Sequence, residues 1–286
     1  MKKGFDPKNM ATKDLHQLII GSVAPRPIAF VSTFDENGNL NLAPYSFFNA
    51  FSSNPPILVF SSNRRVTNNT TKDTLHNILT TKKAVINAVS YDIVRQMSLS
   101  SVEFDPGVSE FEKVGLTPQP SHVIDVPGVK ESPVNMECVV KDIIALGEHG
   151  GAGHLIICEV VYISIDENKF TDGKLDPYKL DLMARMGRNY YVRANGDAIM
   201  EIHQSVTDKP IGFDGLPDDI VKSNILTGNE IAAMACLLQF PDAEEKQKVL
   251  QTHFNGIKPA KELLHQKAAV LIREKKVEEA LALLMA

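Results

Sequence analysis

Residues 39–56 read NLNLAPYSFFNAFSSNPP and place four aromatic rings among serines, asparagines and prolines. The pair Asn37-Gly38 precedes this stretch and indicates a tight hairpin turn, because Asn-Gly readily takes positive φ angles. Apolar rings left in water would favour aggregation. We therefore expect the protein core, a second subunit or a planar ligand to cover them.

The composition is that of an ordinary globular protein, with 286 residues of which 43% are hydrophobic and 23% charged. The formal net charge of -5 argues against broad electrostatic capture of nucleic acid or of an acidic membrane. No apolar run approaches the roughly 20 residues that a membrane helix requires, and the first residues lack the apolar core of a secretion signal. We expect a cytoplasmic protein that binds neither nucleic acid nor membrane.

The cysteines and histidines show no metal-ligand spacing. Cys138, Cys158 and Cys236 are far apart and lie in apolar segments, which predicts buried thiols rather than disulfides. The sequence also lacks a Rossmann or P-loop fingerprint and a G-x-S-x-G nucleophile turn. We therefore expect no metal site and no hydrolytic nucleophile.

The periodicity of apolar residues changes near residue 205. Before it, extended segments rich in Val and Ile predict strands over residues 28–33, 57–61, 84–89, 136–146 and 155–165. Short helical patterns follow Asp73 and Asp92, which we expect to cap two helices. The fold class is therefore mainly β, within the α+β class, over residues 1–204.

The last part of the chain, residues 205–286, has helical periodicity throughout. Thr227 and Glu230 have the spacing of a capping box, and Asp242 with Glu245 repeats it. Asn255-Gly256 is typical of a helix end. These signals predict an all-helical C-terminal appendage of three or four helices.

Two polar segments have the composition of a phosphate site. Ser61-Ser62-Asn63-Arg64-Arg65 follows a predicted strand, and Thr70-Thr71-Lys72-Asp73-Thr74 opens a predicted helix. Hydroxyls, an arginine fork, a lysine and free amides at a helix start suit a phosphate monoester. The same residues also suit turns, a helix cap at Asp73 and solvated bases, and composition alone favours this simpler interpretation.

An ordered set of motifs resembles the flavin reductase-like family, in its flavoredoxin-like branch with an FMN-binding split β-barrel. The motifs are PRPIAFVST at residues 25–33, NLAPYSFFN at 41–49 and PPI at 55–57. KDT at 72–74 and GHLIICEVV at 153–161 stand where the family has comparable segments. The resemblance covers roughly residues 14–203 and implies a split β-barrel with helical insertions, outside which the helical appendage lies.

The resemblance also implies where FMN would bind. The isoalloxazine ring would lie along the loop after the first hairpin, with a second subunit of a homodimer closing the pocket. The residues implied at the ring are Ser46, Phe48, Asn49 and Ala50. Those implied at the FMN phosphate are Ser61, Ser62, Arg64, Lys72 and Thr74, which reverses the simpler interpretation of these segments.

Three further residues are implied at the margins of the site. Arg26 would approach the flavin or support its loop, and His154 and Arg188 would lie at the edge of the pocket. Arg185 and Arg188 suit a surface role equally well.

The activity that the resemblance implies is that of an NAD(P)H:flavin oxidoreductase, in which NADH or NADPH gives a hydride to N5 of FMN. No catalytic residue is assigned, because the cofactors carry this chemistry and the protein aligns their rings and excludes water. The alternative is a non-enzymatic, flavoredoxin-like electron carrier that docks redox protein partners through its helical tail. The two interpretations share FMN and differ in the electron donor.

Overall fold

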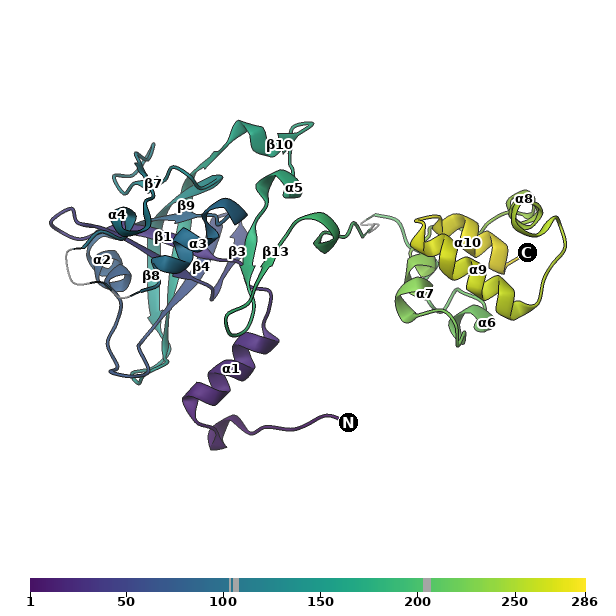
Figure 1. The fold of residues 1–286 in the computed structure, drawn as a ribbon, viewed down its shortest axis with the longest axis horizontal. Helices are drawn as coiled ribbons and strands as arrows, with labels where there is room; N and C mark the ends of the chain where they lie inside the picture. Colours follow the sequence, from purple (N-terminus) through teal and green to yellow (C-terminus); the bar gives the residue numbers. More distant parts are fainter. Residues whose placement is uncertain (103, 105–107, 203–206) are drawn as a thin grey trace. The chain divides into compact units, whose positions relative to one another are not determined.

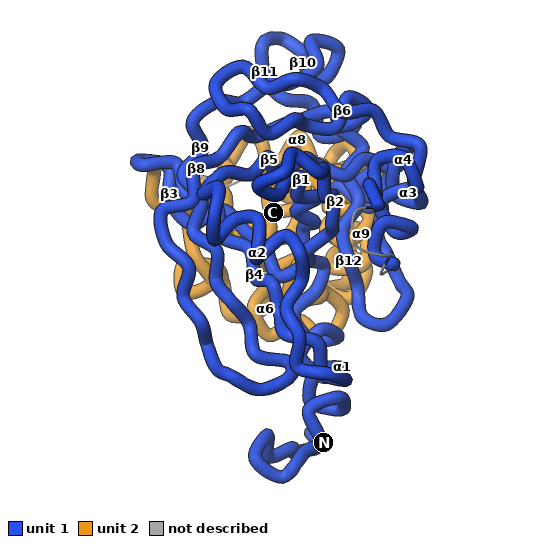
Figure 2. The backbone as a smooth tube through the Cα atoms, turned by 90° about the vertical axis from the view of Figure 1, so that its left-hand side faces the viewer, with its two compact units in different colours: residues 1–199 blue, residues 200–286 orange. Residues whose placement is uncertain are grey.

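The computed structural model describes residues 1–102, 104, 108–202 and 207–286. The chain forms two compact units, residues 1–199 and 200–286, which Figure 2 distinguishes by colour. The domain boundary predicted between residues 204 and 205 lies outside the described residues.

The first unit is built on one antiparallel sheet of seven strands in the order β2-β1-β5-β8-β9-β4-β3 (Figure 1). The strands are β1 (Ala29–Phe34), β2 (Leu40–Tyr45), β3 (Phe48–Ser53), β4 (Pro56–Asn63), β5 (Lys83–Asn87), β8 (Val134–Ala145) and β9 (Gly153–Ile165). All five strands that the apolar segments predicted are present. The mainly β, α+β class is therefore confirmed.

The two edge strands of this sheet, β2 and β3, are consecutive in the chain and are joined only by Ser46 and Phe47. This short link brings the edges of the sheet together, and the Ser61 amide donates to the Phe47 carbonyl at 2.8 Å where they meet. The sheet consequently closes into a barrel at the aromatic stretch around Ser46 and Phe47.

The predicted hairpin between β1 and β2 is confirmed. Asp35 Oδ1 accepts from the amides of Asn37 and Asn39, each at 2.9 Å, and Gly38 takes a φ of 83°. Strand β1 is buried on both faces, because Val31 packs in the barrel interior and Phe30 packs in a second core outside it. That explains why the apolar residues Ala29, Phe30 and Val31 stand side by side rather than alternating with polar ones.

Short elements surround the barrel. The helices are α1 (Thr12–Ser22), α2 (Asp73–Thr81), α3 (Val94–Leu99), α4 (Glu110–Val114) and α5 (Pro177–Leu180), with 3-10 turns η1 (Pro7–Asn9), η2 (Tyr91–Ile93), η3 (Glu167–Lys169) and η4 (Gly196–Ala198). The two-stranded ribbons pair β6 (Pro118–Gln119) with β7 (Gly128–Val129), β10 (Phe170–Thr171) with β11 (Lys174–Leu175), and β12 (Met183–Arg185) with β13 (Tyr191–Arg193).

Two predicted helix caps are wrong. The extended residue before α2 is Lys72, so Asp73 is the first helical residue, where its carboxylate faces the positive end of the helix dipole instead of capping it. Asp92 lies within the 3-10 turn η2 that precedes α3. Helix α2 thus begins one residue earlier than a cap at Asp73 would set it, and α3 begins one residue later than a cap at Asp92 would.

The second unit contains five helices among its described residues, one or two more than predicted. They are α6 (Asp218–Val221), α7 (Gly228–Ala235), α8 (Ala243–Phe254), α9 (Lys261–Arg273) and α10 (Val277–Leu284). The additional one, α6, is a single turn, too short to give a periodic pattern. Both capping boxes, Thr227 with Glu230 and Asp242 with Glu245, are confirmed, as is the helix end at Asn255.

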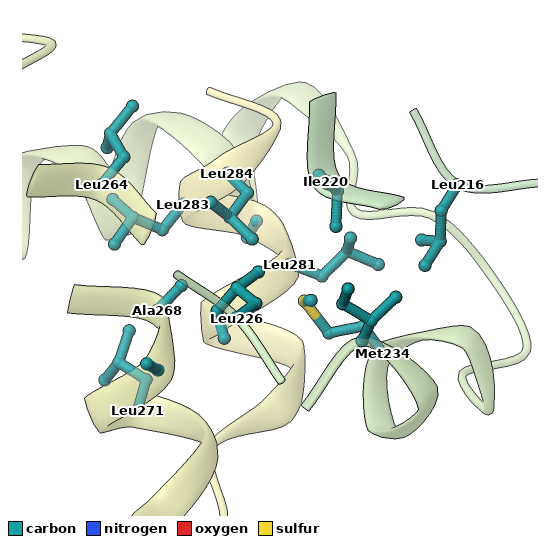
Figure 3. Packing of buried hydrophobic residues seen from close by; sticks show 14 of the residues in the cluster. Leu216, Ile220, Leu226, Met234, Leu264, Ala268, Leu271, Leu281, Leu283 and Leu284 are labelled. Atoms are coloured by element: carbon teal, nitrogen blue, oxygen red, sulfur yellow. The ribbon is translucent and has the colours of Figure 1, made fainter. Parts of the chain in front are cut away.

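The helical unit buries its apolar stripes in a core of its own. The side chains drawn in Figure 3 converge on this core, in which Met234, Leu271 and Leu281 are fully buried. Glu230, itself buried, accepts from Arg273 Nε at 3.0 Å. A unit with its own closed core meets a basic requirement for independent folding.

Two of the three cysteines follow the prediction of buried thiols. Cys138 and Cys158 lie in the barrel interior, whereas Cys236 is exposed because it ends α7, one residue beyond the buried Ala235. Among the described residues, no helix is both long enough and apolar enough to cross a bilayer.

Candidate functional site

The link between β2 and β3 is the centre of the candidate site. Ser46 is half-buried within it, and β3 continues with the exposed residues Asn49 and Ala50. Phe48 is half-buried and packs against the barrel interior. Because β3 is the last strand of its sheet, one of its edges offers main-chain amides and carbonyls to a ligand.

Arg26 lies close to this link, with its guanidinium carbon 5.9 Å from the centre of the Phe47 ring. It is 5% exposed and donates to the carbonyls of Ile20, at 2.6 Å, and of Val23, at the end of α1. A third bond reaches the Met186 carbonyl at 3.2 Å. Burial lowers the pKa of Arg26. Both terminal nitrogens are thus held by backbone carbonyls, whereas the buried Nε makes no hydrogen bond to a described residue. The three carbonyl contacts favour the supporting role over direct contact with a ligand.

The polar end of β4 adjoins the same link. Ser61 and Ser62 pair there with Leu155 and His154 of β9. His154 Nδ1 lies 3.1 Å from the Ser62 carbonyl. The strand register therefore places His154 beside the two serines.

The glycines beside His154 allow this close packing. A Cβ atom at Gly153 would collide with Ser61 Oγ, and one at Gly150 would lie 3.0 Å from the Arg65 carbonyl oxygen. The segment Gly150-Gly151-Ala152-Gly153 is therefore rich in glycine for a steric reason. Its structural role is to let the turn before β9 approach the end of β4.

A group of buried hydroxyls lies next to the two serines. The Tyr45 ring packs against Phe60 at 5.0 Å between centroids, and Lys72 Nζ lies 5.1 Å from the Tyr45 ring centre. Burial raises the pKa of Tyr45 to about 12, and the nearby hydroxyls of Thr74 and Ser62 act in the opposite direction. The three hydroxyls of Tyr45, Ser62 and Thr74 are therefore neighbours.

By geometry, two of these hydroxyls make no hydrogen bond to a described residue, although each lies near another hydroxyl of the group. They are Tyr45 Oη and Ser62 Oγ, in residues that are 5% and 1% exposed. Thr74 Oγ1 accepts from Asn41 Nδ2 at 2.8 Å, which leaves the hydrogen of the Thr74 hydroxyl to donate. An unpaired buried hydroxyl costs about 1 to 3 kcal/mol. Donors without acceptors beside a lysine fit an oxyanion, and the residues present consequently fit the phosphate of FMN.

Arg64 closes the loop between the two polar segments. Its Nε donates to Asn69 Oδ1 at 2.8 Å and one terminal nitrogen donates to the Asn69 carbonyl at 2.7 Å. Asn69 supports this loop with a φ of 57°. The Arg64 side chain thus shapes the loop that joins Ser62 to Lys72.

Among the residues predicted at the site, Arg188 has the fewest described contacts with the serines, Lys72, Thr74 and His154. It is exposed, with a φ of 54°, in the turn between β12 and β13. Its carbonyl accepts from Arg185 at 2.7 Å. The structure gathers the predicted serines, Lys72, Thr74 and His154 at one end of β4, and it places Arg188 in a separate hairpin.

Sequence reasoning missed Tyr45 and Gly153. Tyr45 sits between Pro44 and Ser46, next to the residues implied at the ring, yet its side chain packs in the barrel interior. The period-2 alternation of a strand was the available signal for Tyr45. No signal in the sequence announces the collision that excludes a side chain at residue 153.

Comparison with known proteins gives consistent results. The family described as flavin reductase like domain matches residues 21–185. An uncharacterized protein of Aquifex aeolicus is 38% identical over 189 residues, which are 66% of this chain and 94% of that protein.

Solved structures agree with this match. Nitrilotriacetate monooxygenase component B from Bacillus cereus is 32% identical with a TM-score of 0.65, covering 72% of this chain and 99% of that one. The 2-nitrobenzoate 2-nitroreductase from Pseudomonas fluorescens is 29% identical with a TM-score of 0.62, and the match covers 72% of this chain and 99% of that one. A chain with a split barrel domain from Shewanella frigidimarina is 26% identical, with a TM-score of 0.60 and coverage of 71% and 100%.

Proposed function

The chain belongs to the flavin reductase-like family, and from this premise we propose that it is an NAD(P)H-dependent oxidoreductase that uses bound FMN. Its split β-barrel and its family support a flavin-related redox role. The relatives whose names describe a monooxygenase component and a nitroreductase support an enzyme rather than an electron carrier. In the proposed reaction, FMN supplies N5, which takes a hydride from NADH or NADPH.

The observation that carries the choice of FMN is the pair of unpaired buried hydroxyls beside Lys72. Tyr45 Oη and Ser62 Oγ need acceptors, and a phosphate group provides several. The Lys72 ammonium supplies the positive charge that a dianion requires in a chain whose net charge is negative. A flavin without a phosphate would leave these donors unpaired.

The ring of the flavin would lie along the link and β3, at Ser46, Phe48, Asn49 and Ala50. The unpaired edge of β3 supplies main-chain donors and acceptors that orient a flat heterocycle. Arg26, which joins the end of α1 to the Met186 carbonyl, lies against this link at the Phe47 ring. In this arrangement the chain positions the ring and shields one of its faces, without any side chain transferring a proton.

The proposed assembly is a homodimer that closes the flavin pocket. Several large apolar side chains on the strands are exposed, among them Phe51 on β3 at 69% and Ile163 on β9 at 51%. Burial of such side chains at a second subunit would stabilise the pair, since apolar area removed from water contributes about 25 cal/mol per Å². Light scattering at micromolar concentration measures the mass, and a stable monomer would contradict the pairing.

We propose that residues 1–204 bind FMN without help from residues 205–286, which form an appendage. All residues assigned to FMN lie in the first unit, and the helical unit has its own core. A chain that ends at residue 202 should therefore keep its FMN affinity. If this shortened chain folds but loses FMN, the helical unit supplies part of the pocket.

The deciding experiment mixes the FMN-loaded protein with NADH or NADPH without oxygen. The proposal expects the flavin's visible absorption to bleach within minutes with at least one of the two nucleotides. A flavin that a redox protein reduces, but neither nucleotide does, would select the electron carrier instead. Failure of the purified protein to bind added FMN would overturn both.

A further inference from the structure

A hollow adjoins the β2–β3 link and α3. Its volume is about 380 Å³, and its lining includes Ser46, Met97, Ser98, Ser101 and Arg185. None of the contacts assigned to the FMN phosphate extends into it. The hollow shares Ser46 with the proposed ring site, which places it beside the flavin rather than at its phosphate.

Arg185 is the charged group of this hollow. Its guanidinium carbon lies 4.5 Å from the centre of the Tyr191 ring, and one terminal nitrogen donates to the Arg188 carbonyl at 2.7 Å. No other hydrogen bond holds this guanidinium within the described part of the chain, and no carboxylate there forms an ion pair with it. Aromatic stacking and one hydrogen bond thus fix the direction of the fork and leave donors for a ligand.

A second positive charge lies next to Arg185. The backbones of Arg26 and Arg185 pair through two hydrogen bonds of 2.9 and 2.8 Å. After burial, the charge of Arg185 is the second cause that lowers the pKa of Arg26. The guanidinium groups therefore repel each other, and among the described residues neither has a carboxylate to offset this repulsion.

We propose that Arg185 and the hydroxyls of Ser98 and Ser101 form a subsite for the oxyanion of the second substrate, the molecule that exchanges electrons with the flavin. This inference rests on the proposed function, because Ser46 connects the subsite to the ring. An arginine fork matches the two oxygens of a carboxylate or phosphate, and the serine hydroxyls supply further donors.

The other lining residues indicate the chemistry of the part of the substrate that carries no charge. Ile28, Met97 and the Tyr191 ring are apolar, so the site combines an apolar wall with one anion-binding end. This combination suits a small planar acid such as an aromatic carboxylate. The phosphate of a nicotinamide nucleotide has the same oxyanion chemistry, and the choice of probe distinguishes the two.

The test titrates benzoate, and separately inorganic phosphate, into the full chain loaded with FMN. Calorimetry measures binding, and the flavin's visible spectrum reports whether the anion lies near the ring. We expect benzoate to bind and to perturb the spectrum, with Arg185→Gln weakening it roughly 10- to 100-fold through loss of charge-assisted hydrogen bonds. Arg185→Lys should fall between, since it keeps the charge and loses the fork.

Arg95→Gln is the matched control. Arg95 is exposed on α3, does not line the hollow, and its replacement changes the net charge by the same amount. Ser101→Asp provides a second route if Arg185→Gln does not fold. Its carboxylate would pair with Arg185 at an exposed position and should abolish benzoate binding while the arginine remains.

The outcomes separate this inference from the proposed function. If phosphate binds through Arg185 and benzoate does not, the oxyanion comes from a nucleotide and the subsite stands. If FMN binds but neither anion does at millimolar concentration, or if Arg185→Gln and Arg95→Gln bind equally well, the subsite is refuted and the proposed function is untouched. Absence of FMN binding would instead refute the proposed function.

Discussion

Replacing Ser62 with alanine should change the flavin-free protein and its FMN complex in opposite directions. In the flavin-free protein, Ser62 Oγ is buried without a hydrogen-bond partner, so its removal also removes an unsatisfied polar group. That group costs about 1 to 3 kcal/mol, and we expect the barrel to become more stable by up to this amount. In the complex, the same hydroxyl would donate to a charged phosphate oxygen.

Loss of a hydrogen bond to a charged group costs about 1.5 to 3 kcal/mol, which predicts an increase in the Kd for FMN of roughly 10- to 150-fold. Riboflavin, which has no phosphate, should bind equally well to both proteins. Fluorescence titration measures the two affinities. Amide hydrogen exchange in β4 and β9 measures the stability of the barrel separately from that of the helical unit.

Ser32→Ala is the control for this prediction. Ser32 is also a fully buried serine, but its hydroxyl donates to the Pro127 carbonyl at 2.6 Å. Its removal should destabilise the barrel, because the carbonyl would lose its partner. If Ser62→Ala destabilises the barrel as Ser32→Ala does, and leaves FMN affinity unchanged, Ser62 is an ordinary core residue and the phosphate lies elsewhere.

Three further predictions concern other parts of the chain. Lys72→Ala combined with Arg64→Ala should raise the Kd for FMN on the order of a hundredfold and leave riboflavin binding nearly unchanged, as titration would show. Gly153→Ala should destabilise the barrel by about 1 to 3 kcal/mol in urea unfolding through its collision with Ser61 Oγ, whereas Gly228→Ala, which meets open space, should not. Burial lowers the pKa of His265 below its ordinary 6.5, so the unfolded chain binds the proton more readily than the folded chain. Amide hydrogen exchange in α9 should therefore show full stability above pH 6.5 and a loss of stability below it. The variant His265→Gln should not show this loss.

The sequence correctly predicted those turns and helix ends that depend only on neighbouring residues. The Asn37-Gly38 turn and both capping boxes formed as expected, since each depends on residues within one turn of chain. The ordered motifs anticipated the barrel, which no single strand pattern defines. The caps at Asp73 and Asp92 failed because Asp73 is itself the first helical residue and Asp92 lies within a 3-10 turn.

The candidate site was predictable in its main-chain outline and not in its side-chain interactions. Register alone brings Ser62 beside His154, and a strand pattern together with the family resemblance could reach that far. The roles of Arg26 and Arg64 depend on carbonyls and an amide supplied by loops whose course no periodicity specifies. A long cationic side chain can reach several such partners. The role of an arginine is therefore the hardest to predict from the sequence.

The charge distribution around the β2–β3 link connects these results. A chain with a net charge of -5 repels anions at long range, so every anion that it binds must be held by charges placed locally. On one side of the link, the Ser61 amide joins β4 to Phe47 and leads to Lys72 and the unpaired hydroxyls. The other side carries Arg185, without a carboxylate partner among the described residues. A ligand at Ser46 would lie between two separate positive sites, one suited to the phosphate of the cofactor and the other to the oxyanion of its redox partner. With both proposed sites occupied, charge alone would fix the order of the two molecules along the link, and their rings would be aligned without a general acid or base.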